Sequence, residues 1–210
     1  CPLDLGSTWR VDRDAQYPGG TTAITRPLPI GPPSREMRQA FAGVLRGMFA
    51  ISELRFPEGL AGRDIDAIAR APLWAAGQEY DRGTGHGVGS FLSVHEGPQR
   101  LSRAGDVPLQ PGMILSNEPG YYRPGAFGIR IENLITVIEA EPLPGGDDRA
   151  MLAFETLTYA PIDLRLIEAS ELTKSEKDWL NAYHHEVYTK LSPLLAPPTG
   201  QWLAQATRSI

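Results

Sequence analysis

Two histidines and two glutamates stand out in this sequence because of their neighbours. His86 and His95 lie in the glycine-rich stretch GTGHGVGSFLSVHEGP. The glycines beside His86 let the backbone pass close to a ligand, whereas a histidine that fills a core normally has bulky neighbours. Glu118 (in SNEPGYY) and Glu132 (in FGIRIENL) lie in β-prone segments beside glycines. A carboxylate in an apolar strand is costly to bury unless it is paired or binds a metal, so these residues are candidate metal ligands.

Several of these polar residues also admit structural roles. Arg130 and Glu132 are two residues apart, so they would share one face of a strand and could pair with each other in water. Asp12 has charged neighbours on both sides, for which a solvent-exposed strand is the simpler explanation. His184 and His185 lie in the last clear helical pattern, where we expect one packed and one exposed side chain. Spacing alone leaves metal binding and structural roles open.

Other kinds of site do not fit the motifs. The glycines of GTGHGVGS alternate strictly, which gives neither G-x-G-x-x-G nor a phosphate-binding loop with its lysine. His95 and Glu96 are not followed by a second histidine four residues on, so the helical zinc-protease motif is absent. Cys1 is the only cysteine, so no intramolecular disulfide can form, and a terminal thiol has no fixed neighbour to make it a nucleophile.

The elements that must position these residues follow from hydrophobic periodicity and turn residues. A hairpin is predicted with strands at 9–13 and 21–25, joined by the turn YPGG. Further β-prone runs predict a mainly antiparallel sheet, with strands at 113–116, 128–138 and 151–160. Helices are predicted at 34–54, from 64 onward with a break at Pro72, at 174–191, and briefly after 197.

Length and composition limit the class of protein. The 210 residues predict one domain, and 41% apolar residues are typical of a globular fold. Twenty-five acidic and twenty basic side chains give a net charge of −5, which argues against nucleic acid as a partner. The apolar runs are far shorter than the roughly 20 residues that a bilayer requires, so we expect no membrane span. Because the chain starts with Cys1-Pro2, we expect it to be a piece of a longer polypeptide.

Three motifs together resemble a known family. GTGHGVGSFLSVHEGP, MILSNEPGYY and FGIRIENL, in this order and with the two glutamates 14 positions apart, resemble the catalytic domain of Xaa-Pro aminopeptidases (aminopeptidase P) in the creatinase and methionine-aminopeptidase superfamily. The resemblance covers roughly residues 9–206, including DxxxQYxxGTT and LTKSEKDWLNAYH. It implies an α+β pita-bread fold, a curved, mainly antiparallel sheet covered by helices. Residues 1–210 would be one C-terminal catalytic domain, without the N-terminal domains of the family.

The resemblance also implies a site, a substrate and partners. The metal ligands would be Asp12, His86, Glu118 and Glu132. Glu118 would also shuttle protons, and His95 would contact the peptide near the scissile bond and help to stabilise the oxyanion. The implied cofactor is a divalent metal, Mn²⁺ first and Zn²⁺ or Co²⁺ as alternatives. The implied substrates are peptides with proline at the second position, and a cytoplasmic homodimer is expected.

The chain departs from the family pattern at three positions. Ala23 stands where the family has a second, bridging aspartate, and Arg82 where it has a substrate-side histidine. Asp14 replaces a glycine and would share a strand face with Asp12. Two divalent ions bring a charge of +4 against −3 from Asp12, Glu118 and Glu132, so we expect one ion and impaired activity. The alternative is an inactive pita-bread module for dimerisation or peptide binding.

Overall fold

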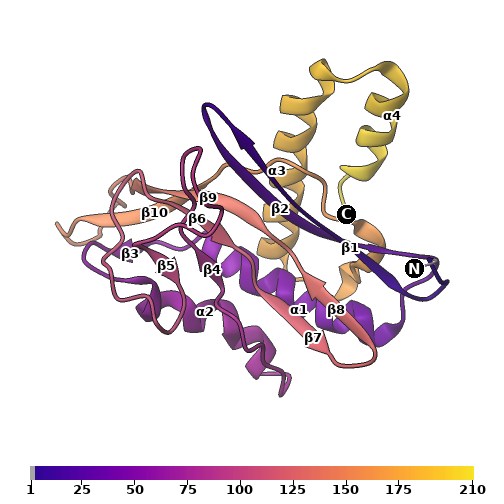
Figure 1. Ribbon diagram of the computed structural model, residues 1–210, viewed down its shortest axis with the longest axis horizontal. Coiled ribbons are helices and arrows are strands. Elements are labelled where there is room, and N and C mark those ends of the chain that lie inside the picture. The colour runs from indigo at the N-terminus through magenta and orange to yellow at the C-terminus, as the bar shows by residue number, and fades with distance from the viewer. Residues whose placement is uncertain (1–2) are drawn as a thin grey trace.

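Residues 3–210 are the part of the chain that the computed structural model describes, and most of its strands follow one another between the first two and the last two α-helices (Figure 1). The helices are α1 (Arg35–Ser52), α2 (Gly62–Trp74), α3 (Lys174–Leu191) and α4 (Pro197–Ala206). The strands are β1 (Thr8–Tyr17), β2 (Gly20–Pro29), β3 (Phe56–Pro57), β4 (Gly85–His86), β5 (Arg100–Leu101), β6 (Ile114–Asn117), β7 (Gly120–Arg123), β8 (Phe127–Arg130), β9 (Asn133–Glu139) and β10 (Met151–Thr156). The expectation for Cys1 lies outside the described residues.

The strands pair antiparallel, as predicted. The largest sheet has the order β3-β10-β9-β6, and two-stranded ribbons form from β1-β2, β4-β5 and β7-β8. Two isolated bridges join the pieces: Thr25 pairs with Glu132, and Gly87 pairs with Leu115. The predicted hairpin is confirmed, and its strands are longer than expected. These bridges bring β2 and β4 against the segments that carry the two candidate glutamates.

Helix α1 forms where the apolar periodicity predicted it. Ser34 caps its N-terminus by accepting a hydrogen bond from the Met37 backbone N–H at 3.1 Å. Most of the helix is buried between the strands and α2. At Gly47 an added Cβ would lie 2.2 Å from the Ala69 carbonyl oxygen, so glycine lets α1 and α2 approach closely. The two helices therefore form one tightly packed layer against the sheet.

Two local predictions were wrong. The break expected at Pro72 is absent, because Pro72 lies in the last turn of α2, where its missing N–H leaves only one carbonyl unpaired. The helix ends at Trp74, and the φ of +69° at Gly77 in the following turn lets the Gln78 N–H bond to the Leu73 carbonyl. The continuous strand expected at 128–138 is interrupted between β8 and β9, where Glu132 bridges to β2 instead.

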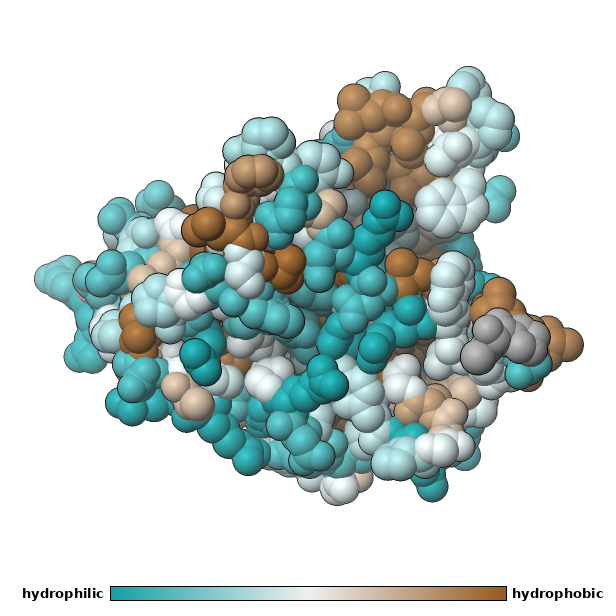
Figure 2. Space-filling view, viewed as in Figure 1, coloured by the Kyte–Doolittle hydropathy of each residue, from teal (hydrophilic) through white to brown (hydrophobic). Residues whose placement is uncertain are grey.

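The C-terminal helices form a pair that projects from the sheet (Figure 1). Thr173 and Glu176 form a capping box at the start of α3, which has the bounds predicted from the sequence. The end of the chain returns to α3, where the Ile210 N–H donates to Asn181 Oδ1 at 3.0 Å. On the face shown in Figure 2, apolar side chains gather over this pair, and Leu194 and Trp202 are exposed. Among the described residues, every helix is too short or too polar to cross a membrane.

Candidate metal centre

Three of the predicted ligands meet in one place. His86 ends β4, Glu118 follows β6, and Glu132 lies between β8 and β9. One ligand atom from each residue lies within 4.8 Å of the other two. They line a cavity of about 370 Å³, whose walls are Arg10, Asp12, Asp14, Arg82, Gly83, Gly85, His86, Val94, His95, Glu118, Arg130 and Glu132. Segments far apart in the sequence therefore converge on one polar cavity.

Glycines explain how His86 comes so close to β6. A Cβ on Gly85 would lie 1.8 Å from the Ser116 carbonyl oxygen, and a Cβ on Gly87 would lie 2.1 Å from the Glu96 carbonyl oxygen. The His86 backbone N–H donates to Ser116 Oγ at 3.0 Å, and that hydroxyl donates to Glu118 Oε1 at 2.9 Å. The glycines flagged in the sequence thus bring an imidazole and a carboxylate together through one serine.

The His86 ring is oriented so that one nitrogen faces the acidic pair. Nδ1 donates to the Gly87 carbonyl at 2.8 Å, which leaves Nε2 as the atom that faces Glu118 Oε1 at 3.1 Å. A backbone carbonyl on the far nitrogen is the usual partner of a metal-binding histidine, because it selects the tautomer and the ring orientation. Burial lowers the pKa of His86, but Glu118 and the Gly87 carbonyl raise it more, so it lies above its ordinary value.

The two glutamates differ in their electrostatics. Glu132 is 3% exposed, and burial followed by the nearby Glu118 charge raises its pKa to about 7. Thr25 Oγ1 donates to Glu132 Oε2 at 2.6 Å. Burial also raises the pKa of Glu118, but His86 and Arg130 lower it more, so it lies below its ordinary value. Two adjacent carboxyls with one imidazole are a donor set that suits Mn²⁺ or Zn²⁺, since a cation between them would relieve their repulsion.

Asp12, the fourth expected ligand, lines the same cavity but has another partner. Its carboxylate contacts the Arg130 guanidinium, and Arg10 Nη2 lies 4.0 Å from it. Arg130 Nη1 is also 3.5 Å from Glu118 Oε2. The alternative in which Arg130 pairs with Glu132 is therefore wrong, because β8 ends between them and Arg130 extends toward Asp12. The sequence gives no sign of this position of Arg130 between two carboxylates, since the strand pattern around it fits a surface residue equally well.

Ala23, which stands where the family pattern has an aspartate, lies opposite Asp14 in the β1-β2 hairpin. Asp14 pairs directly with Ala23 across the hairpin, as Asp12 pairs with Thr25, so all four side chains share one face. Ala23 is 1% exposed, and Asp14 is exposed at the cavity wall. Asp12 and Asp14 therefore share one face of the hairpin, as predicted. The Ala23 methyl group lies on the same face, where the family pattern has a carboxylate.

The remaining candidates lie around the cavity or far from it. The His95 ring lies edge-on to that of His86, with centroids 4.1 Å apart, and is exposed at the cavity. Arg82 also lines this cavity. His184 is fully buried in α3 and His185 is exposed, which confirms the prediction of one packed and one exposed side chain. His95 and Arg82 are therefore the additional side chains within reach of a molecule bound here.

The chain belongs to metallopeptidase family M24, whose model matches residues 2–139. The model for the C-terminal region of peptidase M24 matches residues 150–210. Aminopeptidase P1 of Arabidopsis thaliana is 44% identical over 211 residues, which cover 99% of this chain and 33% of that protein. Aminopeptidase P2 of the same plant is 49% identical, over 99% of this chain and 30% of that protein. The chain thus spans about a third of the length of these curated relatives.

Solved structures share the fold. X-prolyl aminopeptidase from Caenorhabditis elegans, described as a cytosolic enzyme with a di-nuclear active site, has a TM-score of 0.89 at 34% identity, over 97% of this chain and 33% of that chain. Xaa-Pro dipeptidase from Bacillus anthracis has a TM-score of 0.64 at 30% identity, over 79% of this chain and 42% of that chain. The predicted α+β class is confirmed: this is the pita-bread fold, a curled antiparallel sheet covered by helices.

Proposed function

We propose that this chain is the catalytic part of a metal-dependent aminopeptidase that removes an N-terminal residue preceding proline. The observation that carries the proposal is the convergence of His86, Glu118 and Glu132 within 4.8 Å of one another. The aminopeptidase P relatives support the reaction class, and peptides with proline at the second position are the substrates. A cytoplasmic homodimer remains part of this proposal, with the cytosolic C. elegans enzyme as its support for location.

In this proposal, His86, Glu118 and Glu132 would hold a divalent ion, which would act as a Lewis acid and lower the pKa of a water molecule. Glu118 accepts a proton from the attacking water and delivers it to the leaving proline nitrogen. His95 lies beside His86 and donates a hydrogen bond to the oxygen of the attacked carbonyl. Arg130 holds Asp12 and lies near Glu118, which keeps the Glu118 carboxylate ionised.

We propose that the site binds one ion and not two. The ion is Mn²⁺, with Zn²⁺ or Co²⁺ as alternatives. A single +2 ion is balanced by Glu118 and Glu132, while Asp12 is balanced by Arg130. A second ion about 4 Å away would lack the bridge that an aspartate at Ala23 would supply. Asp12, the fourth ligand that the resemblance implies, joins the ion only if it leaves Arg130. We therefore expect turnover well below that of relatives that have both aspartates.

Ala23 and Arg82 favour a second candidate function, that of an inactive module. Ala23 and Arg82 each replace a side chain of the family pattern, one a metal ligand and the other a substrate-side histidine. An inactive pita-bread module that binds peptides or dimerises would tolerate both changes. Such a module would bind an Xaa-Pro peptide without cleaving it.

Peptide cleavage tests the proposal. In added Mn²⁺, a peptide with proline at its second position should lose its N-terminal residue slowly, as followed by mass spectrometry. Glu118→Gln should lower the rate by about 100-fold or more, since it removes the proton carrier. Glu155→Gln, a matched change at an exposed position of β10, should leave the rate unchanged. Peptide binding without cleavage, with Mn²⁺ bound, would favour the inactive module.

A further inference from the structure

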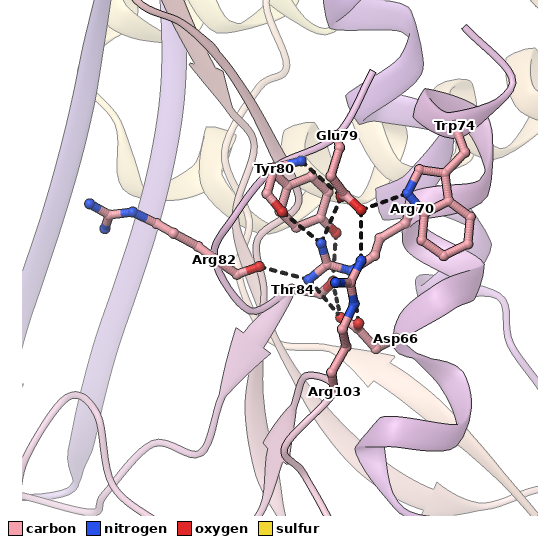
Figure 3. A network of polar contacts seen from close by, with 8 residues as sticks. All are labelled: Asp66, Arg70, Trp74, Glu79, Tyr80, Arg82, Thr84 and Arg103. Carbon is pink, nitrogen blue, oxygen red and sulfur yellow. Dashed lines mark hydrogen bonds and ion pairs between the residues drawn. The ribbon is translucent and has the colours of Figure 1, made fainter. Parts of the chain in front are cut away.

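A buried polar network lies behind the candidate metal centre, between α2 and the loop at residues 78–84 that leads into β4 (Figure 3). Asp66 and Arg70 of α2 form its centre, with side chains only 2% and 3% exposed and an Nε to Oδ2 distance of 2.7 Å. A buried ion pair of this kind is often no more stabilising than apolar residues of similar volume. The pair therefore calls for an explanation other than stability.

Arg70 uses all five of its N–H groups, two on Asp66 and three on the loop. Nε and one Nη2 hydrogen go to the Asp66 carboxylate, at 2.7 and 3.3 Å. The others go to Glu79 Oε1 at 2.8 Å, the Tyr80 carbonyl at 2.8 Å and the Arg82 carbonyl at 2.7 Å. A guanidinium has five N–H donors, so none is left over. Because this loop has no strand partner, Arg70 takes the place of a ladder neighbour for two of its carbonyls.

Thr84 connects this ion pair to the chain that carries His86. Its hydroxyl donates to Asp66 Oδ1 at 2.5 Å, which uses the only proton that a threonine hydroxyl has. The Tyr80 hydroxyl, 2.6 Å away, must then donate to Thr84 Oγ1. Thr84 is fully buried, so water does not replace either bond. The rotamer and position of Thr84 are therefore set by Asp66 and Tyr80.

The backbone of Thr84 continues directly into the metal centre. Its carbonyl accepts a hydrogen bond from the Glu118 N–H at 2.7 Å, and His86 follows two residues later. Gly85, between them, lies so close to Ser116 that a Cβ would not fit. A shift of Thr84 is thus transmitted to both His86 and Glu118. Figure 3 shows the Arg82 side chain pointing away from the network, and Arg82 is one of the residues that line the cavity of the candidate metal centre.

We propose that Asp66, Arg70 and Thr84 are positioning residues that hold His86 and Glu118 at metal-binding distance. Their effect is on the geometry of the ligands, and none of the three touches the ion or the substrate. The inference rests on the proposed metal-dependent function. It predicts that breaking the Thr84 bond weakens metal binding out of proportion to any loss of stability, because ligand spacing has to match the ion closely.

Thr84→Val tests the inference, because valine keeps the shape of threonine and removes only the hydroxyl. We expect the affinity for Mn²⁺, measured by calorimetry on the metal-free protein, to fall about tenfold or more. Thr84→Ser keeps the hydroxyl and should restore most of the affinity. Thr207→Val, which removes a hydroxyl bonded to the Leu203 carbonyl in α4, is the matched control and should bind Mn²⁺ as the unchanged protein does.

A fall in thermal stability for Thr84→Val with Mn²⁺ affinity equal to that of Thr207→Val would overturn the inference and leave Thr84 a purely structural residue. If Thr84→Val does not fold, Tyr80→Phe is the second variant, since it removes the donor to Thr84 and keeps the ring. It should weaken Mn²⁺ binding in the same direction, and unchanged affinity would overturn the inference. Absence of Mn²⁺ binding by the unchanged protein would instead contradict the proposed function itself.

Discussion

Glu118 and Glu132 show how position alone separates two identical side chains. Glu118 lies beside His86 and Arg130, which keep its pKa below the ordinary value. Glu132 is more deeply enclosed and faces the Glu118 charge, so its pKa rises to about 7. Burial and a neighbouring like charge make the ionised form of such a carboxyl unfavourable. A cation bound beside it would stabilise that ionised form. The pair has the electrostatics of a metal site, which an exposed ion pair would lack.

Two substitutions separate a metal ligand from an ion-pair partner. Glu132→Gln should lower the Mn²⁺ affinity by about 100-fold or more, since it removes a charged ligand from the group of three. Asp12→Asn should change the affinity by less than about tenfold, because the Asp12 carboxylate contacts Arg130. Calorimetric titration of both variants measures the difference. Equal losses would place Asp12 among the ligands, as the family resemblance implies.

The residues of the site were easier to predict than their pairings. Glycine neighbours singled out His86, and the cost of burial singled out Glu118 and Glu132. The partner of Arg130 was not predictable, because it depends on a three-dimensional contact with Asp12 that lies 118 residues away in the chain. Thr84 carried no signal in the sequence, since its hydroxyl matters only once α2 packs beside the loop.

At the scale of elements, the β1-β2 hairpin decides how many carboxylates face the cavity. Its register places Ala23 opposite Asp14 on the same face as Thr25. This position is 1% exposed, so the methyl group fills space that an aspartate would share with the ion. In the proposed metal centre, the hairpin is therefore the element that would set the number of ions.

An aspartate at position 23 should destabilise the metal-free protein but favour the binding of metal. In the metal-free protein, Ala23→Asp should destabilise the fold by about 1–3 kcal/mol, because it buries an unpaired charge. With Mn²⁺ present, it should raise the binding stoichiometry toward two ions and increase the rate of peptide cleavage. Thermal unfolding and calorimetry measure both effects. Thr22→Asp, at the exposed neighbouring position, should do neither, and no change in stoichiometry for Ala23→Asp would contradict the proposed ligand count.

Elements with strong periodicity were predicted well, and their interruptions were not. The bounds of α3 follow from its capping box and apolar spacing, and those of α1 from Ser34 and its buried stripe. The gap between β8 and β9 was missed because the β-prone run 128–138 has no glycine or proline after Gly128 to mark an interruption. The chain changes partner there, from β7 to β2, which only the tertiary pairing reveals.

At the scale of the whole molecule, two hydrophobic clusters share the same helices. Phe41 and Leu45 of α1 lie in one cluster, and Ile51 of the same helix lies in the other. In α2, Leu73 belongs to the first and Ile65 to the second. Because neither cluster can lose its packing without disturbing both helices, we propose that the described residues form one cooperative unit. Calorimetric and van't Hoff enthalpies of unfolding should agree.

Buried His184 should make the fold sensitive to acid. Burial, and then the charge of Arg26, lower its pKa to about 4, whereas the imidazole of an unfolded chain titrates near 6.5. Between these values only the unfolded state binds the proton, so stability is lost as pH falls from about 6.5 to about 4. The contribution is about 3 kcal/mol.

Urea unfolding at pH 7 and pH 4 measures this effect. His184→Asn should lose about 3 kcal/mol less than the unchanged protein between the two values, since asparagine does not titrate. His185→Asn, at the exposed neighbouring position in α3, should lose as much as the unchanged protein. Identical pH dependence in all three proteins would contradict this prediction, because it would show that His184 has the same pKa in the folded and unfolded states.

The most direct test of the central claim is anomalous diffraction from a crystal of this chain soaked in Mn²⁺. We expect one strong peak per chain, about 2 Å from His86 Nε2 and from a carboxylate oxygen of both Glu118 and Glu132. Absence of any peak among these three side chains, or a peak held by other residues, would contradict the proposed metal centre.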